Sequence, residues 1–344
     1  MARPAPHTYA AAGVSIAAAD RAKTRIARLA RASFTRHVLA GIGGFGGLFQ
    51  LPAGLRRPVL VASMDGVGTK LKVAIAAGVH DTVGRDLVNH CVNDILVQGA
   101  APLFFLDYIA LGVMAPGVVA ALVAGLSRGC RENGCALLGG ETAEMPGFYA
   151  PGDYDLAGSI VGVVERARLL TGAGIRPGDV LVGLPSAGLH TNGYALARRL
   201  LFDVAHYKLS TRLPDVGATV AEALLAEHRS YLPLLRPWLG RLRGLAHITG
   251  GGIPGNLPRI LPSGCAAQVR LSAWTPPPLF ALLQRLGRVP AADMRRTFNL
   301  GIGMIAVLAP AHADAFLRHL RRRGEAAVVL GQVVPGARRV VFTR

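Results

Sequence analysis

The stretch "SMDGVGTKLKVA" (residues 63–74) joins a predicted strand to a predicted helix through a loop that contains two glycines. The apolar run "PVLVASM" before the loop is typical of a strand, and "KLKVAIAAG" after it is typical of a helix. The order differs from a Walker A loop, and an acid at its start would repel a bare phosphate unless a cation intervened. The loop therefore predicts a cation-assisted phosphate site, with Asp65, Gly66, Gly68, Thr69 and Lys70 as its candidate residues.

Strand and helix patterns continue along the whole chain and predict two domains. The chain has 344 residues, of which 51% are hydrophobic and 17% charged, which is typical of a globular protein. We predict an α+β protein made of two α/β-type domains, with the boundary near residue 168 in the Gly/Pro-rich "RARLLTGAGIRPGDV". The domains would be residues 1–168 and 169–344, and the second would mix strands with helices, including one helix over "EALLAEHRSYLPLLRPWL" (222–239).

The formal charge of +18 raises the question of a nucleic-acid partner. The arginines of the chain are spread over many predicted helices. Aromatic residues make up only 6% of the sequence and do not alternate with the arginines, so we expect no nucleic-acid partner. The longest uncharged run, residues 108–127, is interrupted by Gly112, Pro116 and Gly117, so we expect no membrane span. The four cysteines form no Cys-x-x-Cys pair, which favours a cytoplasmic protein.

The predicted helix over residues 85–98 has an unusual polar face. A solvated helix face normally carries Lys, Glu and Arg, whereas this face carries short amides, a histidine and acids. The pattern favours a face turned toward a binding site over an ordinary surface face. Its residues are Asp86, Asn89, His90, Asn93, Asp94 and Gln98.

The segment "GIGGFGGLFQLP" (41–52) matches the spacing of a dinucleotide fingerprint but precedes Pro52 instead of opening a helix. It is either a flap that covers a ligand with its backbone or a plain flexible loop. The glycines of the candidate flap are Gly43, Gly44 and Gly46.

A third carboxylate follows another predicted strand. Glu141 comes directly after "LLGG", and the ends of strands are where open α/β sheets bind ligands. Mg²⁺ commonly uses one or two carboxylates together with water and phosphate oxygens. We therefore predict a Mg²⁺ site formed by Asp65, Asp94 and Glu141.

Two loops in the second half suit anions. "GLPSAGLHTNGYALARRL" places His190 and Asn192 between a strand and a helix, where backbone N–H groups attract anions, although Asn192 is also a typical helix cap. "AHITGGGIPGN" follows another strand, and its glycines let backbone amides approach a phosphate closely. The candidate residues of this second loop are His247, Thr249, Gly250, Gly251 and Gly252.

Together these motifs resemble the phosphoribosylformylglycinamidine cyclo-ligase (aminoimidazole ribonucleotide synthetase) family. The resemblance is carried by "GGFGGLFQLP", "DGVGTKLK", "CVNDILVQGAAPLFFLDYIA", "GGETAEMPG", "HTNGYALAR", "HITGGGIPGNLPR" and "RTFNLGIGM", and runs from Tyr9 nearly to the C-terminus. It implies ATP-dependent closure of formylglycinamidine ribonucleotide to aminoimidazole ribonucleotide, with release of ADP and phosphate. It also implies a homodimer paired through the sheets of its N-terminal, ATP-binding domains.

On this resemblance, Mg²⁺ on ATP would be held by Asp65, Asp94 and Glu141, and Lys70 and Asn93 would lie at the ATP phosphates. His190 would act on the transferring phosphoryl group or the substrate, as a hydrogen-bond donor or as a proton carrier. The alternatives are a small-molecule kinase of the same ATP-using superfamily and, because of the charge of +18, a non-catalytic nucleotide-binding or nucleic-acid-associated protein. The loops at Asn192 and at 247–252 would bind the ribose-phosphate end of the substrate.

Overall fold

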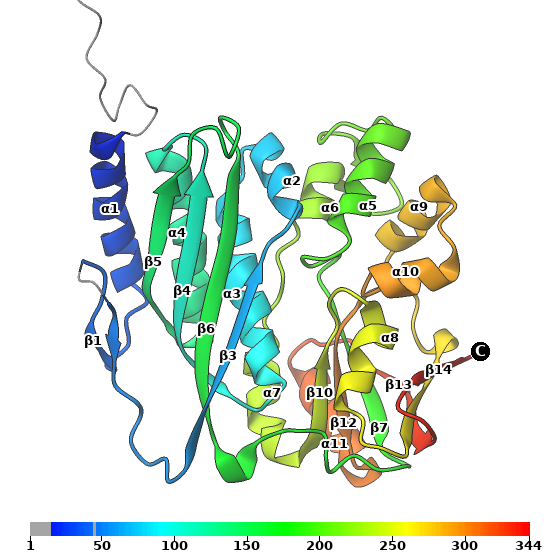
Figure 1. The fold of residues 1–344 in the computed structure, drawn as a ribbon. Helices are drawn as coiled ribbons and strands as arrows, with labels where there is room; N and C mark the ends of the chain where they lie inside the picture. Colours follow the sequence, from blue (N-terminus) through cyan, green and yellow to red (C-terminus); the bar gives the residue numbers. More distant parts are fainter. Residues whose placement is uncertain (1–14, 44–45) are drawn as a thin grey trace, which may run out of the picture.

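The computed structural model describes residues 15–43 and 46–344, which form two large neighbouring sheets, each packed against helices, and two small two-stranded sheets, β1-β2 and β8-β9 (Figure 1). The first half contains α1 (Ile16–Arg31), β1 (Val38–Ala40), β2 (Leu48–Phe49), β3 (Pro58–Gly66), α2 (Lys70–Ala77), α3 (Asp81–Leu96), β4 (Ala101–Leu111), α4 (Pro116–Asn133), β5 (Ala136–Glu144) and β6 (Tyr154–Glu165).

The second half is built from short helices and a larger sheet. Its strands are β7 (Val180–Pro185), β8 (Arg212–Leu213), β9 (Ala218–Thr219), β10 (Leu242–His247), β11 (Cys265–Arg270), β12 (Ile302–Leu308), β13 (Val328–Pro335) and β14 (Val340–Thr343). Its α-helices are α5 (Tyr194–Arg198), α6 (Val220–Leu225), α7 (Leu232–Leu235), α8 (Gly252–Asn256), α9 (Pro278–Gly287), α10 (Ala291–Thr297) and α11 (Pro310–Arg322). Among the described residues, no helix is both long enough and apolar enough to cross a membrane.

The N-terminal sheet has the strand order β3-β6-β4-β5 and is covered on one face by α3 and α4 (Figure 1). Successive residues of a strand point to opposite faces. In β4, Phe105 and Ile109 are buried toward the helices, whereas Leu106 and Tyr108 are 38% and 37% exposed on the other side. The second face of this sheet is therefore open and carries apolar side chains.

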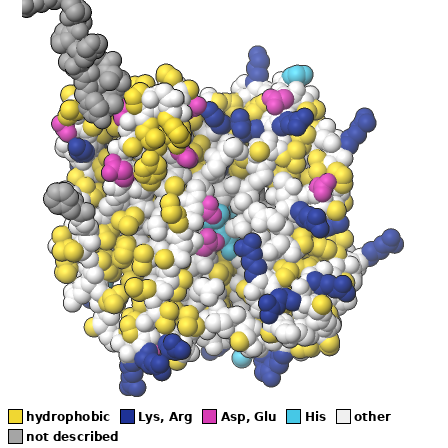
Figure 2. Space-filling view, in the orientation of Figure 1, with side chains coloured by type: hydrophobic (Ala, Val, Ile, Leu, Met, Phe, Trp, Pro, Cys, Tyr) yellow, Lys and Arg dark blue, Asp and Glu magenta, His cyan; other side chains and the backbone are white. Residues whose placement is uncertain are grey.

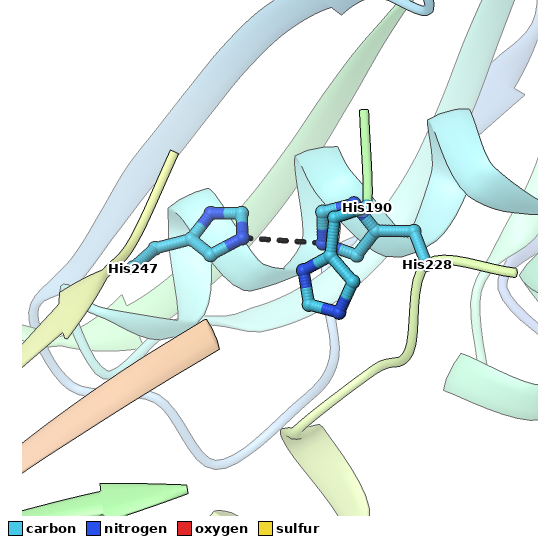
Figure 3. Close-up of side chains that lie close together, drawn as sticks. All are labelled: His190, His228 and His247. Atoms are coloured by element: carbon cyan, nitrogen blue, oxygen red, sulfur yellow. Dashed lines mark hydrogen bonds between the residues drawn. The ribbon is translucent and has the colours of Figure 1, made fainter. Parts of the chain in front are cut away.

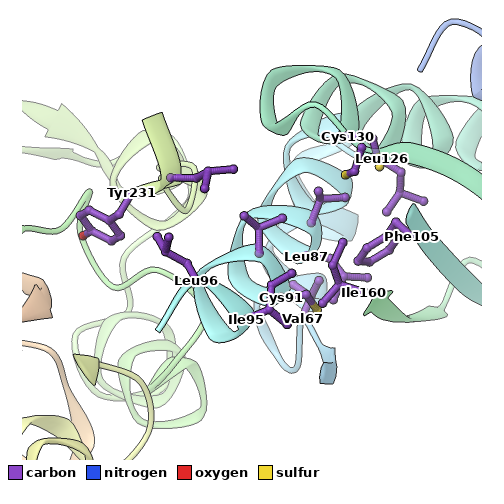
Figure 4. Close-up of a cluster of buried hydrophobic side chains, with 14 of the residues drawn as sticks. Val67, Leu87, Cys91, Ile95, Leu96, Phe105, Leu126, Cys130, Ile160 and Tyr231 are labelled. Atoms are coloured by element: carbon purple, nitrogen blue, oxygen red, sulfur yellow. The ribbon is translucent and has the colours of Figure 1, made fainter. Parts of the chain in front are cut away.

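Helix α3 lies at the centre of the N-terminal core. Leu87, Cys91 and Ile95 recur at helical spacing and are fully buried, as the sequence pattern predicted. Figure 4 shows these side chains between α4 and the sheet on one side and Tyr231 of the second half on the other. The helix thus contacts both halves of the protein.

Close packing of α3 against α4 depends on glycine. A Cβ on Gly84 would lie 2.3 Å from the carbonyl oxygen of Leu122, and one on Gly125 would lie 1.9 Å from that of Asp81. Real Cβ atoms do not approach backbone this closely, so a side chain at either position would push the two helices apart.

The C-terminal sheet has the order β10-β12-β7-β13-β11-β14. Its strands pair antiparallel except β11 and β14, which are parallel, so the expected mixed sheet is confirmed. Leu181, Ile305 and Leu330 are fully buried within its core. The expected domain limits at residue 168 remain a prediction.

One predicted helix is wrong. Instead of a single helix over residues 222–239, α6 ends at Leu225, α7 starts at Leu232, and residues 226–231 between them are irregular. A helix interior does not tolerate a proline such as Pro233. The irregular segment 226–231 is here called the strap, and its backbone forms hydrogen bonds with Asn89 and Asn93 of α3. The apolar spacing of the sequence did not reveal the break.

Gly125→Ala is expected to lower the free energy of unfolding by about 1–3 kcal/mol, because the new methyl group would collide with the α3 backbone. Gly117→Ala in the same helix is the matched control, since a Cβ there meets nothing within 4 Å. The control should leave stability unchanged or raise it by up to about 1 kcal/mol. Urea unfolding of both variants measures the difference, and equal effects would contradict the close helix contact.

Candidate functional site

A buried ion pair links α2, α3 and the strap. Lys70 Nζ lies 2.6 Å from Asp86 Oδ2, and both side chains are fully buried. Lys70 Nζ also donates to the carbonyl oxygen of Ala226 at 2.8 Å and to that of His190 at 3.3 Å. Asp86 Oδ1 accepts the backbone N–H of His228 at 2.5 Å. The expected contact of Lys70 with a phosphate is therefore corrected, because its ammonium group already has partners inside the protein.

The amides of α3 bond the rest of the strap. Asn89 Nδ2 donates to the carbonyl oxygen of His228 at 2.7 Å. Asn93 Nδ2 donates to the carbonyl oxygen of Arg229 at 2.9 Å, while Asn93 Oδ1 accepts the N–H of Tyr231 at 3.0 Å. The expectation that this polar face turns toward a ligand is wrong for Asp86, Asn89 and Asn93, which bond protein backbone. The expected ATP contact of Asn93 is corrected accordingly.

The strap brings His228 against two histidines of the C-terminal loops. The rings of His190 and His228 are stacked, with centroids 4.0 Å apart and planes 23° apart. His228 Nε2 lies 3.2 Å from His247 Nε2, the contact drawn in Figure 3. All three side chains are buried. Burial lowers the pKa of each, most strongly for His190 and His228, so these two rings are uncharged at neutral pH.

Asp65 and Asp94 lie beside this histidine cluster and approach a common atom, His90 Nε2. Asp65 Oδ2 lies 2.7 Å from that nitrogen, and Asp94 Oδ2 lies 3.7 Å from it. Asp94 Oδ1 also pairs with His247 Nδ1 at 2.8 Å, which joins the two domains at this point. Figure 2 shows acidic and histidine side chains together in the hollow between the domains.

The two carboxylates are ionised. Desolvation acts to raise the pKa of Asp65, but the hydrogen bond and charge of His90 prevail and lower it. Desolvation likewise acts to raise the pKa of Asp94, but His247, His90 and Ser63 together lower it. The Asp65 contact correspondingly raises the pKa of His90 against the effect of burial. Ionised carboxylates that face one space are ligands that Mg²⁺ prefers, so this pair fits the expected cation.

The histidine cluster fits a metal ion less well. Ring nitrogens of His190, His228 and His247 lie within 4.8 Å of one another. However, an imidazole presents its lone pair in the plane of the ring, and the rings of His190 and His228 lie face to face. Two stacked rings cannot both direct a lone pair at one ion, so the Asp65 and Asp94 side of the site is where a cation fits.

The structure does not bring Glu141 to this carboxylate pair. Across the sheet, Asp65 of β3 is paired with Gly158 of β6, Gly158 with Asp107 of β4, and Asp107 with Gly140 of β5. Strands β3 and β5 are therefore three strand spacings, or about 14 Å, apart. Glu141 is paired with Tyr108, whose side chain is on the open face of the sheet. The expected three-carboxylate site is corrected to a pair.

The glycine flap also lies away from the pair within this chain. A Cβ on Gly47 would meet Leu138 of β5, so the loop runs along the sheet edge opposite β3 (Figure 1). Gly43 and Gly46 border open space, and Gly44 lies outside the described residues.

The remaining predicted residues lie in the loop after β3 and in the two C-terminal loops. Gly66 N–H donates to Asp65 Oδ1 at 2.7 Å, Gly68 has a φ of 67°, and Thr69 directly precedes α2. A Cβ on Gly250 would lie 3.1 Å from Asn192 Oδ1, so the two C-terminal loops meet there. The Thr249 loop is held by Asn256, whose Nδ2 donates to the carbonyl oxygens of residues 249, 250 and 252. Gly251 and Gly252 have φ values of 95° and 59°.

Sequence reasoning missed Asp107 and the role of His228. Asp107 is an acid within the apolar strand "PLFFLDYIALG", a signal that could have been noticed. Desolvation raises the pKa of Asp107 to about 7. Its Oδ1 lies 2.3 Å from where a Cβ of Gly140 would be, which explains the glycine there. His228 carried no signal of its own, although Pro233 in the same stretch indicated that the helix must be interrupted nearby.

Comparisons with known proteins agree over both halves. Residues 53–164 match the family "AIR synthase related protein, N-terminal domain", and residues 176–344 match its C-terminal counterpart. The chain is 53% identical over 344 residues to the phosphoribosylformylglycinamidine cyclo-ligase of Sorangium cellulosum (strain So ce56), covering 97% of this chain and 99% of that protein. It is 51% identical over 331 residues to the protein of the same name in Trichlorobacter lovleyi, with 95% and 94% coverage.

Solved structures share the fold at low sequence identity. The thiamine-monophosphate kinase of Stenotrophomonas maltophilia K279a has a TM-score of 0.66 at 19% identity, with 96% of each chain covered. The hydrogenase maturation protein HypE in complex with ATP has a TM-score of 0.61 at 19% identity, with 91% of this chain and 88% of that chain covered.

Lys70→Met is expected to lower the free energy of unfolding by about 3–5 kcal/mol, because Asp86 would remain buried without its partner. The double variant Lys70→Met/Asp86→Leu should lose less than the sum of the two single variants. Lys72→Met is the matched control, since Lys72 is 49% exposed in its pair with Asp153 and should cost at most about 1 kcal/mol. Additive losses in urea unfolding would contradict the buried pair.

Asp107→Asn tests the raised pKa of this half-buried acid through the pH dependence of stability. The folded pKa of about 7 lies above the unfolded value of 3.8, so ionisation of Asp107 destabilises the fold increasingly as pH rises from 3.8 to 7 and fully above 7. The variant should therefore gain about 1–3 kcal/mol over wild type at pH 8.5, and much less at pH 4.5. A difference in unfolding free energy that does not vary with pH would rule out a raised pKa.

Proposed function

The chain belongs to the phosphoribosylformylglycinamidine cyclo-ligase family, and from this premise we propose that the site between its domains closes the imidazole ring of aminoimidazole ribonucleotide. The chain is a ligase of purine biosynthesis, and the substrate is formylglycinamidine ribonucleotide, with ATP converted to ADP and phosphate. The observation that carries the proposal is the contact of Asp94 with His247, which joins ionised carboxylates of one domain to the anion-suited loops of the other.

The ring-closing reaction requires a site for phosphoryl transfer and needs no nucleophile from the protein. The formamide oxygen is a poor leaving group until ATP phosphorylates it, after which the amidine nitrogen attacks that carbon and phosphate departs. The protein must neutralise the transferring group and hold the reacting atoms in register. Asp65 and Asp94 would hold Mg²⁺, which would neutralise charge on the ATP phosphates.

The loop after β3 would contact ATP with its backbone amides at Gly66, Gly68 and Thr69, next to Asp65. Lys70 supports this loop from inside the protein through Asp86. The C-terminal loops would take the ribose-phosphate end of the substrate. Their proposed contacts are His190, Asn192, His247, Thr249, Gly250, Gly251 and Gly252, supported by the approach of Gly250 to Asn192.

A homodimer would cover the open face of the N-terminal sheet. Leu60 and Met64 are 59% and 68% exposed there, and Leu106 and Tyr108 extend the apolar surface across the sheet. Removing such side chains from water stabilises association. Glu141 and the glycine flap lie away from Asp65 within one chain, and pairing through this face would put Glu141 in the interface. The four buried, unpaired cysteines support a cytoplasmic location.

The decisive assay follows both products of the purified protein with formylglycinamidine ribonucleotide, ATP and Mg²⁺. We expect one aminoimidazole ribonucleotide and one free phosphate per ADP. A small-molecule kinase would instead leave the phosphoryl group on the organic product, and a non-catalytic nucleotide binder would give no substrate-dependent ADP.

Asp94→Asn is expected to lower kcat/KM by roughly 10²–10³-fold and to raise the Mg²⁺ concentration needed for half-maximal rate, because one ionised ligand is lost. Asp20→Asn is the control, since Asp20 is exposed on α1 and, within residues 15–43 and 46–344, forms an ion pair with Lys23 alone. Wild-type rates for Asp94→Asn at every Mg²⁺ concentration would overturn the metal assignment.

A further inference from the structure

The ring of His190 is held in one orientation by its surroundings. The backbone N–H of Ala187 donates to His190 Nε2 at 3.0 Å. The backbone of His190 has a φ of 59°, a left-handed conformation that is costly for any residue other than glycine. Lys70 bonds its carbonyl oxygen, and a Cβ on Gly303 would lie 2.6 Å from its Cε1. Such strain persists only where neighbouring contacts impose it.

This orientation fixes the tautomer. Because Nε2 accepts the Ala187 N–H, it holds the lone pair, and the proton of the uncharged ring lies on Nδ1. Nδ1 is fully buried and has no hydrogen-bond partner among the described residues. A buried N–H left without a partner has lost its hydration and gained no hydrogen bond in return. In Figure 3 the Nδ1 edge of the ring points to the side on which His247 lies, within the cluster.

His228 holds the face of this ring and is itself fixed at both of its nitrogens. Its Nε2 lies 3.2 Å from His247 Nε2 and 3.2 Å from Asn93 Nδ2, and its Nδ1 lies 3.4 Å from Thr191 Oγ1. Its backbone is bonded on both sides by Asp86 and Asn89. The ring of His228 therefore belongs to the rigid contact between α3 and the strap. Because it is stacked on the ring of His190, it prevents that ring from rotating.

We propose that His228 is a positioning residue, which holds His190 so that its Nδ1–H is presented as a hydrogen-bond donor to an anionic oxygen of the bound ligand. The inference rests on the proposed function for the identity of that ligand, a phosphorylated substrate or the transferring phosphoryl group. It assigns His190 the role of donor and not of proton carrier. A donor already oriented in a buried site needs no rearrangement when charge develops on the oxygen.

The tautomer can be measured without any assay of activity. In protein labelled with ¹⁵N-histidine, protonated and unprotonated ring nitrogens resonate in separate ranges, and His190→Gln identifies the His190 signals. We expect Nδ1 to be protonated and Nε2 unprotonated in wild type. A protonated Nε2 in the wild-type protein would overturn the proposal, whether or not the protein forms aminoimidazole ribonucleotide.

Two substitutions of His228 separate stacking from hydrogen bonding. His228→Phe keeps an aromatic face against His190, whereas His228→Gln keeps a polar group without the ring. We expect His228→Phe to keep the single His190 tautomer and to retain at least about fivefold more kcat than His228→Gln, which should lose that tautomer, with the KM for ATP of both variants within about twofold of wild type. Equal behaviour of the two variants, at unchanged thermal unfolding, would refute a positioning role.

Substitution of His190 itself distinguishes donor from proton carrier. His190→Asn puts an amide N–H near the place of Nδ1 and tolerates the left-handed backbone, whereas His190→Gln puts it near Nε2. His190→Asn should retain at least about tenfold more kcat than His190→Gln. Equal losses would mean that the ring carries a proton. His312→Gln, at an exposed position of α11, is the control and should match wild type.

Discussion

The buried contact between α3 and the strap is the constraint on which the site depends. Residues 226–231 form irregular backbone in the protein interior, where unbonded N–H and C=O groups are costly. Asp86, Asn89 and Asn93 supply those bonds from one helix face, and Lys70 balances the charge of Asp86. Removal of any one partner would leave a buried polar group unpaired, so these bonds hold the strap in a single conformation against α3.

With the strap fixed in this way, residues from distant parts of the sequence come together in one site. Asp65 and Asp94 come from the N-terminal domain, and His190 and His247 come from loops of the C-terminal domain. The strap adds His228 between the two loops. The result is a polar site whose carboxylates are ionised and whose most deeply buried histidines are uncharged, an arrangement suited to phosphoryl transfer with ordered donors.

Much of this could be predicted from the sequence. Helix α3, strand β3 and the loop after it follow from periodicity and glycine placement, and the motifs are sufficient to indicate the family. The short amides of α3 were correctly recognised as unusual, but no local pattern tells whether an amide bonds a ligand or a strap more than 130 residues away. Lys70 was misassigned for the same reason, and Glu141 because its strand neighbours depend on the sheet order.

Hydrogen–deuterium exchange of Asn89→Ala tests the dependence of the site on the strap most directly. Asn89 bonds the carbonyl oxygen of His228 and is in turn bonded by Asn133, and it contacts no proposed ligand group. We expect amides of residues 226–231 to exchange at least about tenfold faster, with protection of β6 unchanged, and kcat to fall in parallel. Unchanged exchange in the strap together with a loss of activity, or faster exchange with full activity, would contradict the account.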